Sequence, residues 1–354
     1  MKPTGVLMVG SVPGASPHEV FVRLATALPG RLQALPDGET GERWNYIGWQ
    51  LARFPLIARR NELGGTPLPE SGLPTFTLAD IKPTAYDEAA LSSYNEFKQL
   101  RQRNIIPSHI RFQISLPSPY SVLAGHLKPE LALAIEPLYE QRFAETIERI
   151  VTGIPHDDLV IQWDLCFEMT ALEFDRGRPL DTRHQAYFPS PNNSVLHGLV
   201  ERIVRLSERI PRDVKIAFHL CYGDLRHKHF VEPRDTSLLV ELANALLAHE
   251  TISSRTEWIH MPVPKAQTDP DYFAPLKDLK LEKTGSKTPY IYLGVVHAND
   301  AAGTKRRIET AQAIVPFPFG VATECGLGRT PPGEIDSILE ICREVTSVPI
   351  RENL

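Results

Sequence analysis

Short apolar runs recur along the chain, and each is followed by turn residues and then by a pattern with helical spacing. Apolar runs without polar alternation are typical of parallel strands that are buried on both faces. Eight such runs occur, at residues 6–9, 32–35, 111–116, 159–163, 214–220, 258–261, 290–296 and 319–323. Eight strands, each followed by a helix or a long connection, favour a closed barrel over an open sheet. We therefore expect an α/β chain that forms one (β/α)8 TIM barrel, a single domain over residues 1–354.

The predicted helices carry signals at their first turn and along their buried face. Ser16 and Glu19 have the spacing of a capping box, and Pro17 takes the first helical position, where proline is tolerated. The helix after the third apolar run places Tyr139 and Phe143 on one face at helical spacing. These signals predict helices that pack an apolar face against the strands.

Three connections are much longer than the loops usual in compact domains. They cover residues 44–110, 170–193 and 262–287. Long loops of this kind commonly serve as lids or binding segments. We expect them to be excursions over the C-terminal mouth of the barrel, the longest at about 44–110, and not separate domains.

Composition excludes several classes of function. A net charge of −5 argues against a nucleic-acid partner, and no apolar run approaches the roughly 20 residues that a membrane span needs. The first residues lead into a strand and not into a signal peptide, and four cysteines in 354 residues do not make a disulfide framework. We expect a cytoplasmic protein whose partners are small-molecule substrates. A homodimer is compatible with the sequence, which does not fix the oligomeric state.

Side chains that can bind a metal follow two of the predicted strands. His219 and Cys221 are two residues apart at the end of the fifth apolar run, so both point to the same side of the strand. An imidazole and a thiolate together favour zinc. Cys325 lies two residues after the eighth run and is a second thiolate candidate, the alternative being a small buried apolar residue. We assign Cys166 and Cys342 to that alternative.

Five short segments at predicted strand ends occur in a fixed order along the chain. They are Val9-Gly10-Ser11-Val12-Pro13, Asp37-Gly38-Glu39, Ile161-Gln162-Trp163-Asp164, His219-Leu220-Cys221, and Cys325-Gly326-Leu327 with Arg329 beyond. In this order they resemble the catalytic barrel of the cobalamin-independent methionine synthases. That family belongs to a wider superfamily with uroporphyrinogen decarboxylase and the zinc thiol methyltransferases. The resemblance extends over the whole chain but only through these short motifs.

The resemblance implies a substrate-binding set and a metal-binding set. The substrate-binding residues would be Ser11, Glu39, Asp164 and Arg329. The zinc ligands would be His219, Cys221 and Cys325. In the family, the residue matching Glu39 binds homocysteine and the residue matching Asp164 binds its amino group. The resemblance thus implies that Asp164 also takes part in catalysis.

The chain departs from the family pattern at three places. The family has Glu-Pro after the aspartate, where this chain has Leu165-Cys166. The glutamate that ligates zinc after the sixth strand is absent, and His260 is a candidate substitute, the alternative being a structural histidine. The family's folate-contacting Thr-Gly-Pro segment is replaced at residues 116–119, which argues against folate as a cofactor or donor.

His297, at the end of the seventh apolar run, is a further catalytic candidate. A histidine has an ordinary pKa near 6.5, which suits proton transfer. In the resembling family a histidine near this place donates a proton. The alternative for His297 is a packed, structural imidazole.

These observations lead to one expected function and two alternatives. We expect a zinc-dependent transferase that activates a homocysteine-like thiol for methyl or alkyl transfer. The second hypothesis is a lyase, hydrolase or decarboxylase of the same barrel superfamily, with or without a metal, that acts on a small carboxylated substrate. This hypothesis rests on analogy of fold alone. The third is a barrel that binds ligands without catalysis.

Overall fold

The centre of the molecule is a parallel β-sheet whose strands are adjacent in the order in which they occur in the chain. The computed structural model describes residues 2–189, 194–224, 228–281 and 288–348. Within these residues the sheet has seven strands: β1 Ala34–Pro36, β2 Arg111–Pro117, β3 Leu159–Leu165, β4 Lys215–Leu220, β5 Thr256–Pro262, β6 Tyr290–Val296 and β7 Gly320–Thr323. Each overlaps a run predicted from the sequence, so seven predicted strands are confirmed.

The first predicted strand, at residues 6–9, does not form as a regular strand. The segment is buried and makes isolated parallel bridges, from Val6 to Val321 of β7 and from Ser11 to Gly38 after β1. Its amide groups divide between the two sheet edges, because Leu7 N donates to Val321 O (2.9 Å) while Val6 N donates to Arg31 O (2.9 Å). The expected eighth strand is therefore replaced, in the described residues, by an irregular segment that bridges β7 and β1.

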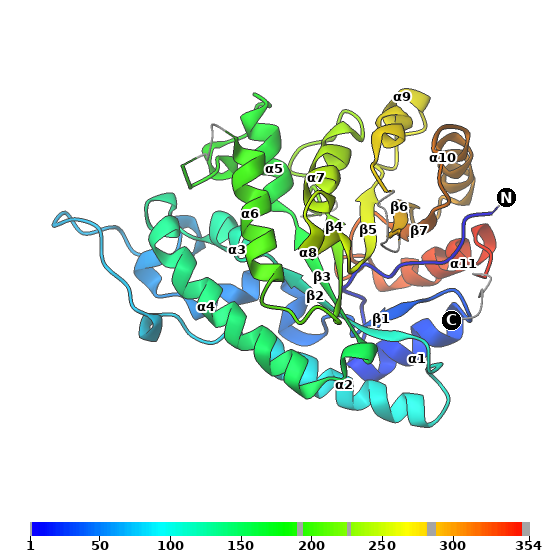
Figure 1. The fold of residues 1–354 in the computed structure, drawn as a ribbon, viewed down its shortest axis with the longest axis horizontal. Helices are drawn as coiled ribbons and strands as arrows, with labels where there is room; N and C mark the ends of the chain where they lie inside the picture. Colours follow the sequence, from blue (N-terminus) through cyan, green and yellow to red (C-terminus); the bar gives the residue numbers. More distant parts are fainter. Residues whose placement is uncertain (1, 190–193, 225–227, 282–287, 349–354) are drawn as a thin grey trace.

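Helices surround the strands (Figure 1). Their bounds are α1 Pro17–Ala27, α2 Tyr86–Gln102, α3 Pro119–His126, α4 Pro129–Gly153, α5 Phe167–Asp175, α6 Val195–Ser207, α7 Ser237–Leu247, α8 Glu250–Ser253, α9 Pro270–Phe273, α10 Ala301–Ile314 and α11 Ile335–Val345. The predicted apolar face of α4 is confirmed, since Tyr139 and Phe143 are fully buried. The buried apolar residues of the helices and strands form one large core cluster, which is the packing that a parallel sheet covered by helices requires.

The predicted cap of the first helix is confirmed, with one difference. Ser16 Oγ accepts a hydrogen bond from Glu19 N, and Pro17 is the first helical residue. The Glu19 carboxylate accepts from Ala15 N at 2.8 Å and not from Ser16 N, so the reciprocal bond reaches one residue further back.

The connection at 44–110 divides into two parts. Residues 44–48 and Leu63 line a cavity at the C-terminal ends of the strands. In contrast, α2 belongs to the helical layer, where Phe97 packs on Phe21 of α1 with ring centroids 5.5 Å apart. The excursion predicted over residues 44–110 thus includes a helix, α2, that lies in the helical layer. The ends of the other two predicted excursions, at 190–193 and 282–287, lie outside the described residues.

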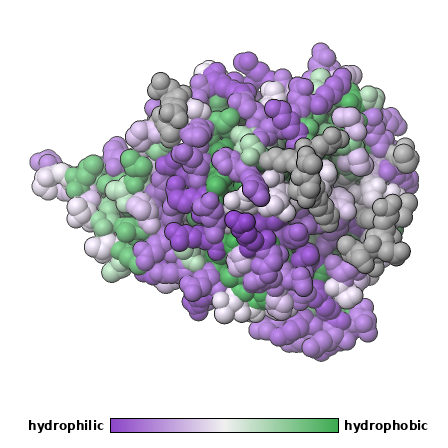
Figure 2. Space-filling model, viewed as in Figure 1, coloured by the Kyte–Doolittle hydropathy of each residue, from purple (hydrophilic) through white to green (hydrophobic). Residues whose placement is uncertain are grey.

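The view in Figure 2 shows a face made mainly of polar residues, with small separate apolar areas. None of the helices in the described residues combines the length and the apolar character that a membrane span requires.

Candidate metal centre

The strand register brings three of the predicted site residues side by side. Asp164 on β3 pairs with His219 on β4, and His219 pairs with His260 on β5. These positions lie near the C-terminal ends of their strands, the side where α/β barrels carry their active sites. The alternation of the sheet then places Cys221, two residues after His219, on the same side.

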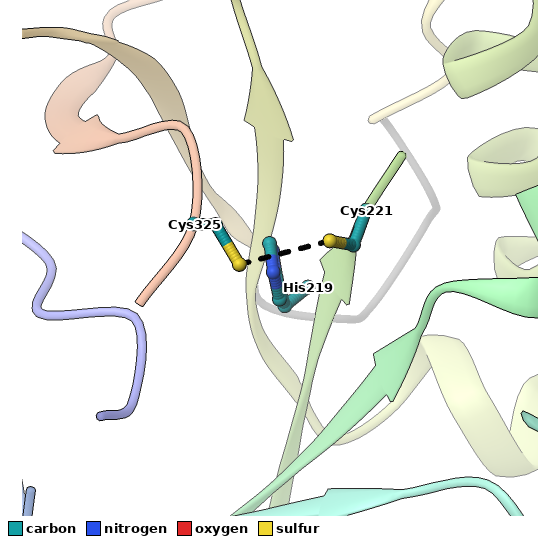
Figure 3. A group of neighbouring side chains, drawn as sticks. All are labelled: His219, Cys221 and Cys325. Carbon is teal, nitrogen blue, oxygen red and sulfur yellow. Dashed lines mark hydrogen bonds between the residues drawn. The ribbon is translucent and has the colours of Figure 1, made fainter. Parts of the chain in front are cut away.

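His219, Cys221 and Cys325 form one group whose ligand atoms all lie within 4.8 Å of one another. The sulfur atoms of Cys221 and Cys325 are 3.8 Å apart (Figure 3). Cys325 follows β7, which is separated from β4 by two strands in the sheet. The meeting of these residues therefore depends on the curl of the sheet. One imidazole and two thiols within this distance are a donor set suited to zinc.

His260 fixes the hydrogen-bonding state of His219. His260 Nε2 lies 2.9 Å from Thr323 O, which only accepts, so Nε2 carries the proton and His260 Nδ1 is an acceptor in the neutral ring. His219 Nδ1 lies 2.7 Å from His260 Nδ1 and must therefore donate to it. Burial lowers the pKa of His260 to about 3 and the pKa of His219 well below its usual value, which is consistent with two neutral rings.

This arrangement leaves a lone pair on His219 Nε2. The atom is buried and has no hydrogen-bond partner among the described residues. A buried polar atom without a partner is costly, and such atoms call for an explanation such as an ion or a water. The predicted ligand His260, by contrast, has both ring nitrogens engaged, with His219 and with Thr323 O.

The two thiols are neutral in the protein without a cation. The pKa of Cys325 is raised by its hydrogen bond with Cys221 and by burial, and the pKa of Cys221 is raised first by hydrogen bonding with Cys166. A divalent cation at the group reverses this balance, because metal coordination deprotonates thiols outright. The site is therefore built so that deprotonation accompanies metal binding.

Glu39 and Asp164 are a pair of carboxyl groups in the same cavity. Burial raises the pKa of Glu39 to about 7, and burial together with Glu39 raises the pKa of Asp164 well above its usual value. Gln162 Nε2 donates to Asp164 Oδ1 at 2.8 Å, which holds the carboxyl in place. An incoming cation, such as the ammonium of an amino acid, stabilises the ionised form of such carboxyl groups.

The turn that carries Glu39 is held by Asp37. Asp37 Oδ1 accepts from Glu39 N at 2.9 Å, and Asp37 forms two hydrogen bonds with the Arg43 guanidinium, at 2.7 and 3.2 Å. Glu39 has a positive φ of 51°, a backbone conformation that is uncommon outside glycine and worth noting at a binding site. The Glu39 carboxyl is thus directed by a rigid local network.

One cavity, with a volume of about 230 Å3, contains both the carboxyl pair and the three candidate metal ligands. Its lining includes His219, Cys221 and Cys325, which we call the His–Cys group, together with Glu39, Asp164, Ser11 and Arg329. Aromatic side chains of Tyr46, Phe167 and Phe230 complete the wall. This volume suits a ligand the size of an amino acid.

Ser11 and Arg329 line this cavity but have contacts of their own. Ser11 Oγ accepts from Gly328 N at 3.1 Å, and Ser11 O accepts from Leu327 N at 2.6 Å. Ser11 therefore holds the loop that carries Cys325. Arg329 Nη1 lies 4.0 Å from Asp224 Oδ2.

His297 does not line the cavity that contains Glu39 and Asp164. Its Nε2 lies 3.0 Å from Val263 O, to which it donates. Burial, with Arg307 nearby, lowers the pKa of His297 to about 3. Its Nδ1 lies 3.5 Å from Glu324 Oε2. The role of His297 as a proton donor stays a prediction.

The fold of this protein is similar to that of a B12-independent methionine synthase. The solved structure of that synthase, from Shewanella sp. W3-18-1 in complex with selenomethionine, superposes on this protein with a TM-score of 0.56. The two sequences are 12% identical, and the match covers 97% of this chain and 96% of that chain. A β-glucosidase mutant derived from a hyperthermophilic tetrameric structure matches with a TM-score of 0.36 at 10% identity, over 99% of this chain and 96% of that chain. The sequence matches no family model and no curated protein.

Sequence reasoning missed several residues of the cavity. Cys166 was assigned to a plain buried position, yet it lines the cavity and contributes a hydrogen bond to Cys221. Its place directly after β3 was the available signal, since strand ends form the mouth. Arg183 and Phe230 come from long connections, and no pattern in the sequence placed them near the site.

We expect the free energy of unfolding of the Glu39→Gln variant to depend less on pH than that of the parent protein. A carboxyl whose pKa is raised from 4.5 to about 7 on folding stabilises the protein below its unfolded pKa. That contribution is lost as the pH rises through about 7, by no more than about 1.4 kcal/mol per pH unit. Urea unfolding at pH 5 and pH 8 checks this. An equal loss of stability in both proteins between these pH values would contradict the assignment.

Proposed function

We propose that this protein transfers an alkyl group, in the simplest case methyl, to the sulfur of a thiol amino acid, with zinc held by His219, Cys221 and Cys325. The observation that carries the proposal is the convergence of three ligand atoms within 4.8 Å, one of them the unpartnered His219 Nε2. The carboxyl pair in the same cavity supports an amino-acid substrate. The similar fold of a B12-independent methionine synthase bound to selenomethionine also supports it.

Different residues of the cavity bind different parts of the substrate. Asp164 and Glu39 accept hydrogen bonds from the substrate ammonium, whose charge draws both groups into the ionised state. The aromatic wall of Tyr46, Phe167 and Phe230 excludes water from the substrate side chain. The substrate thiol then faces the His–Cys group, because one small cavity holds both sites.

Zinc bound there supplies positive charge that lowers the pKa of the substrate thiol, so that the sulfur is a thiolate at neutral pH. The thiolate is the nucleophile that alkyl transfer requires. Cys221, Cys325 and His219 would supply three protein ligands, the number that catalytic zinc sites have. His260 acts behind His219, holding the ring in the tautomer whose Nε2 lone pair faces the thiols.

Two measurements on one preparation test the proposal. Protein purified without chelators is expected to contain one zinc per chain by elemental analysis. Homocysteine is expected to bind to this protein and to release its thiol proton on binding, which is measured by calorimetry in buffers of different ionisation enthalpy. Zinc-free protein that cannot be loaded with zinc, or loaded protein that does not bind homocysteine, would contradict the proposal.

We expect the His260→Phe variant to bind zinc about 10-fold to 100-fold more weakly while keeping all three ligands. Without the hydrogen bond to His260, His219 is no longer held in the tautomer that carries its proton on Nδ1. Loss of the hydrogen-bond partner of a metal ligand typically weakens metal binding by this factor. Competition with a chromophoric chelator measures the affinity. The His156→Phe variant is the control, because His156 lies on the surface and hydrogen-bonds Asp213. Unchanged zinc affinity in the His260 variant would show that the His260 contact does not orient His219.

A further inference from the structure

A second cavity, of about 690 Å3, lies next to the first at the C-terminal ends of the strands. Its walls come from the ends of β5, β6 and β7 and from the residues after β4. The two cavities share four lining residues: Gly223, Asp224, Cys325 and Gly326. They therefore meet at the proposed metal site. The second cavity falls within the range of 300–1,000 Å3 that is usual for larger ligands, and the first does not.

Glu324 and two histidines form the inner wall of the second cavity. Glu324 Oε1 lies 3.3 Å from His229 Nε2, and Glu324 Oε2 lies 3.5 Å from His297 Nδ1. His229 Nδ1 also lies 3.0 Å from Glu232 Oε2, on the outer edge. Burial opposes protonation of His229, but the two carboxylates outweigh it and raise the pKa to about 9. This wall is a set of titratable groups that the thiol-binding cavity does not use.

The lining of the second cavity is acidic. Among the described residues, the carboxyl groups of the lining outnumber its cationic groups, which are Lys265 and the His229 imidazolium. The carboxyl groups are Asp224, Glu232, Glu324 and Glu334. Of these, Asp224 also faces Arg329 of the first cavity at 4.0 Å. A cavity with an excess of one charge concentrates ligands of the opposite charge.

From this charge and position we infer that the second cavity binds the alkyl donor, and that the donor carries its alkyl group on a cationic sulfonium or quaternary ammonium centre. The inference rests on the proposed function and names its second substrate class. Because Cys325 and Gly326 line both cavities, a donor bound in the second cavity lies next to the thiol that the first cavity holds.

The chemistry of such a donor is balanced without further groups. The thiolate sulfur attacks the alkyl carbon and forms a C–S bond, while the bond from that carbon to the cationic sulfur or nitrogen breaks. The electron pair of the broken bond stays on the leaving atom, which departs as a neutral sulfide or tertiary amine. The step requires no proton transfer.

The test compares two probes that differ in charge and hardly in shape. Glycine betaine has a quaternary nitrogen where 3,3-dimethylbutyrate has a carbon atom. We expect zinc-loaded protein to bind betaine at least about 25-fold more tightly, and to lose roughly fivefold of that preference for each of Glu232→Gln and Glu334→Gln, the effect of one favourable charge near a surface. Glu340→Gln on α11, exposed and outside the cavity, is the control and should keep the full preference.

Three results decide the matter, with zinc content and homocysteine binding measured on the same samples. Preference for betaine that falls in the Glu232 and Glu334 variants, together with formation of methionine from homocysteine and betaine or dimethylsulfoniopropionate, supports the inference. Equal binding of both probes, or a preference that these variants do not change, overturns it while homocysteine binding leaves the proposed function standing. Transfer from 5-methyltetrahydrofolate, with a KM that both variants leave unchanged, overturns it as well.

Discussion

Cys221→Ser and Cys325→Ser are each expected to reduce zinc affinity by more than about 100-fold, the upper range for loss of a mere supporting contact to a ligand. Each change removes one thiolate from a three-residue donor set whose sulfur atoms are 3.8 Å apart. A serine hydroxyl does not replace a thiolate for zinc at neutral pH. Homocysteine binding should weaken in parallel, because its thiol loses the charge that deprotonates it. Elemental analysis and calorimetry measure the two effects.

The fold should survive both changes, and circular dichroism checks that it does. The packed core does not include this site, which lies at the strand ends. Cys342→Ala is the matched control, because Cys342 is buried on α11 among apolar side chains. It should lose some stability and keep its zinc. A Cys325→Ser protein that retains full zinc content would refute the donor set.

Asp164→Asn is expected to remove most of the protein's preference for an amino-acid thiol over a thiol that lacks the amino group. Homocysteine and 4-mercaptobutyrate differ only in that group. The parent protein should favour homocysteine by about 10-fold to 100-fold, since a hydrogen bond to a charged group contributes about 1.5–3 kcal/mol. In the Asn variant the two affinities should converge, because the amide does not attract an ammonium. The Glu39→Gln variant should show the same convergence.

Competition calorimetry against zinc-loaded protein gives the two affinities. Glu42→Gln is the control, an exposed carboxylate three residues after Glu39 that does not line the cavity. It should leave the preference unchanged. A large preference for homocysteine that survives in both Asp164→Asn and Glu39→Gln would show that the carboxyl pair does not bind the ammonium.

The strands were the most predictable part of the fold. A run such as 290–296 has apolar residues on both faces because helices cover one face and side chains of the other strands pack against the other, so burial is visible in composition. The segment at 6–9 has the same composition and is equally buried, yet it forms only isolated bridges. Gly5, with a φ of 81°, interrupts the extended backbone just before it. Composition reports burial, and it does not report whether the backbone pairs regularly.

The candidate site was predictable in its members and not in its arrangement. The spacing of His219 and Cys221 is local, and the two-residue period of a strand already places both side chains on one side. The partnership of His219 with His260 depends on register between neighbouring strands, and no local pattern encodes it. Both ring nitrogens of His260 are engaged with His219 and Thr323 O, an arrangement that the sequence did not indicate.

The sequence by itself determined which segments are buried, where the strands end, and that an imidazole and two thiols stand at those ends. Short-range rules suffice for this, because side-chain alternation and helix capping act over a few residues. The curl of the sheet decided that Cys325 meets Cys221 across two intervening strands. It also decided that a second, acidic cavity lies beside Cys325. Both depend on distances between residues far apart in the chain, which only packing of the whole sheet and its helices sets.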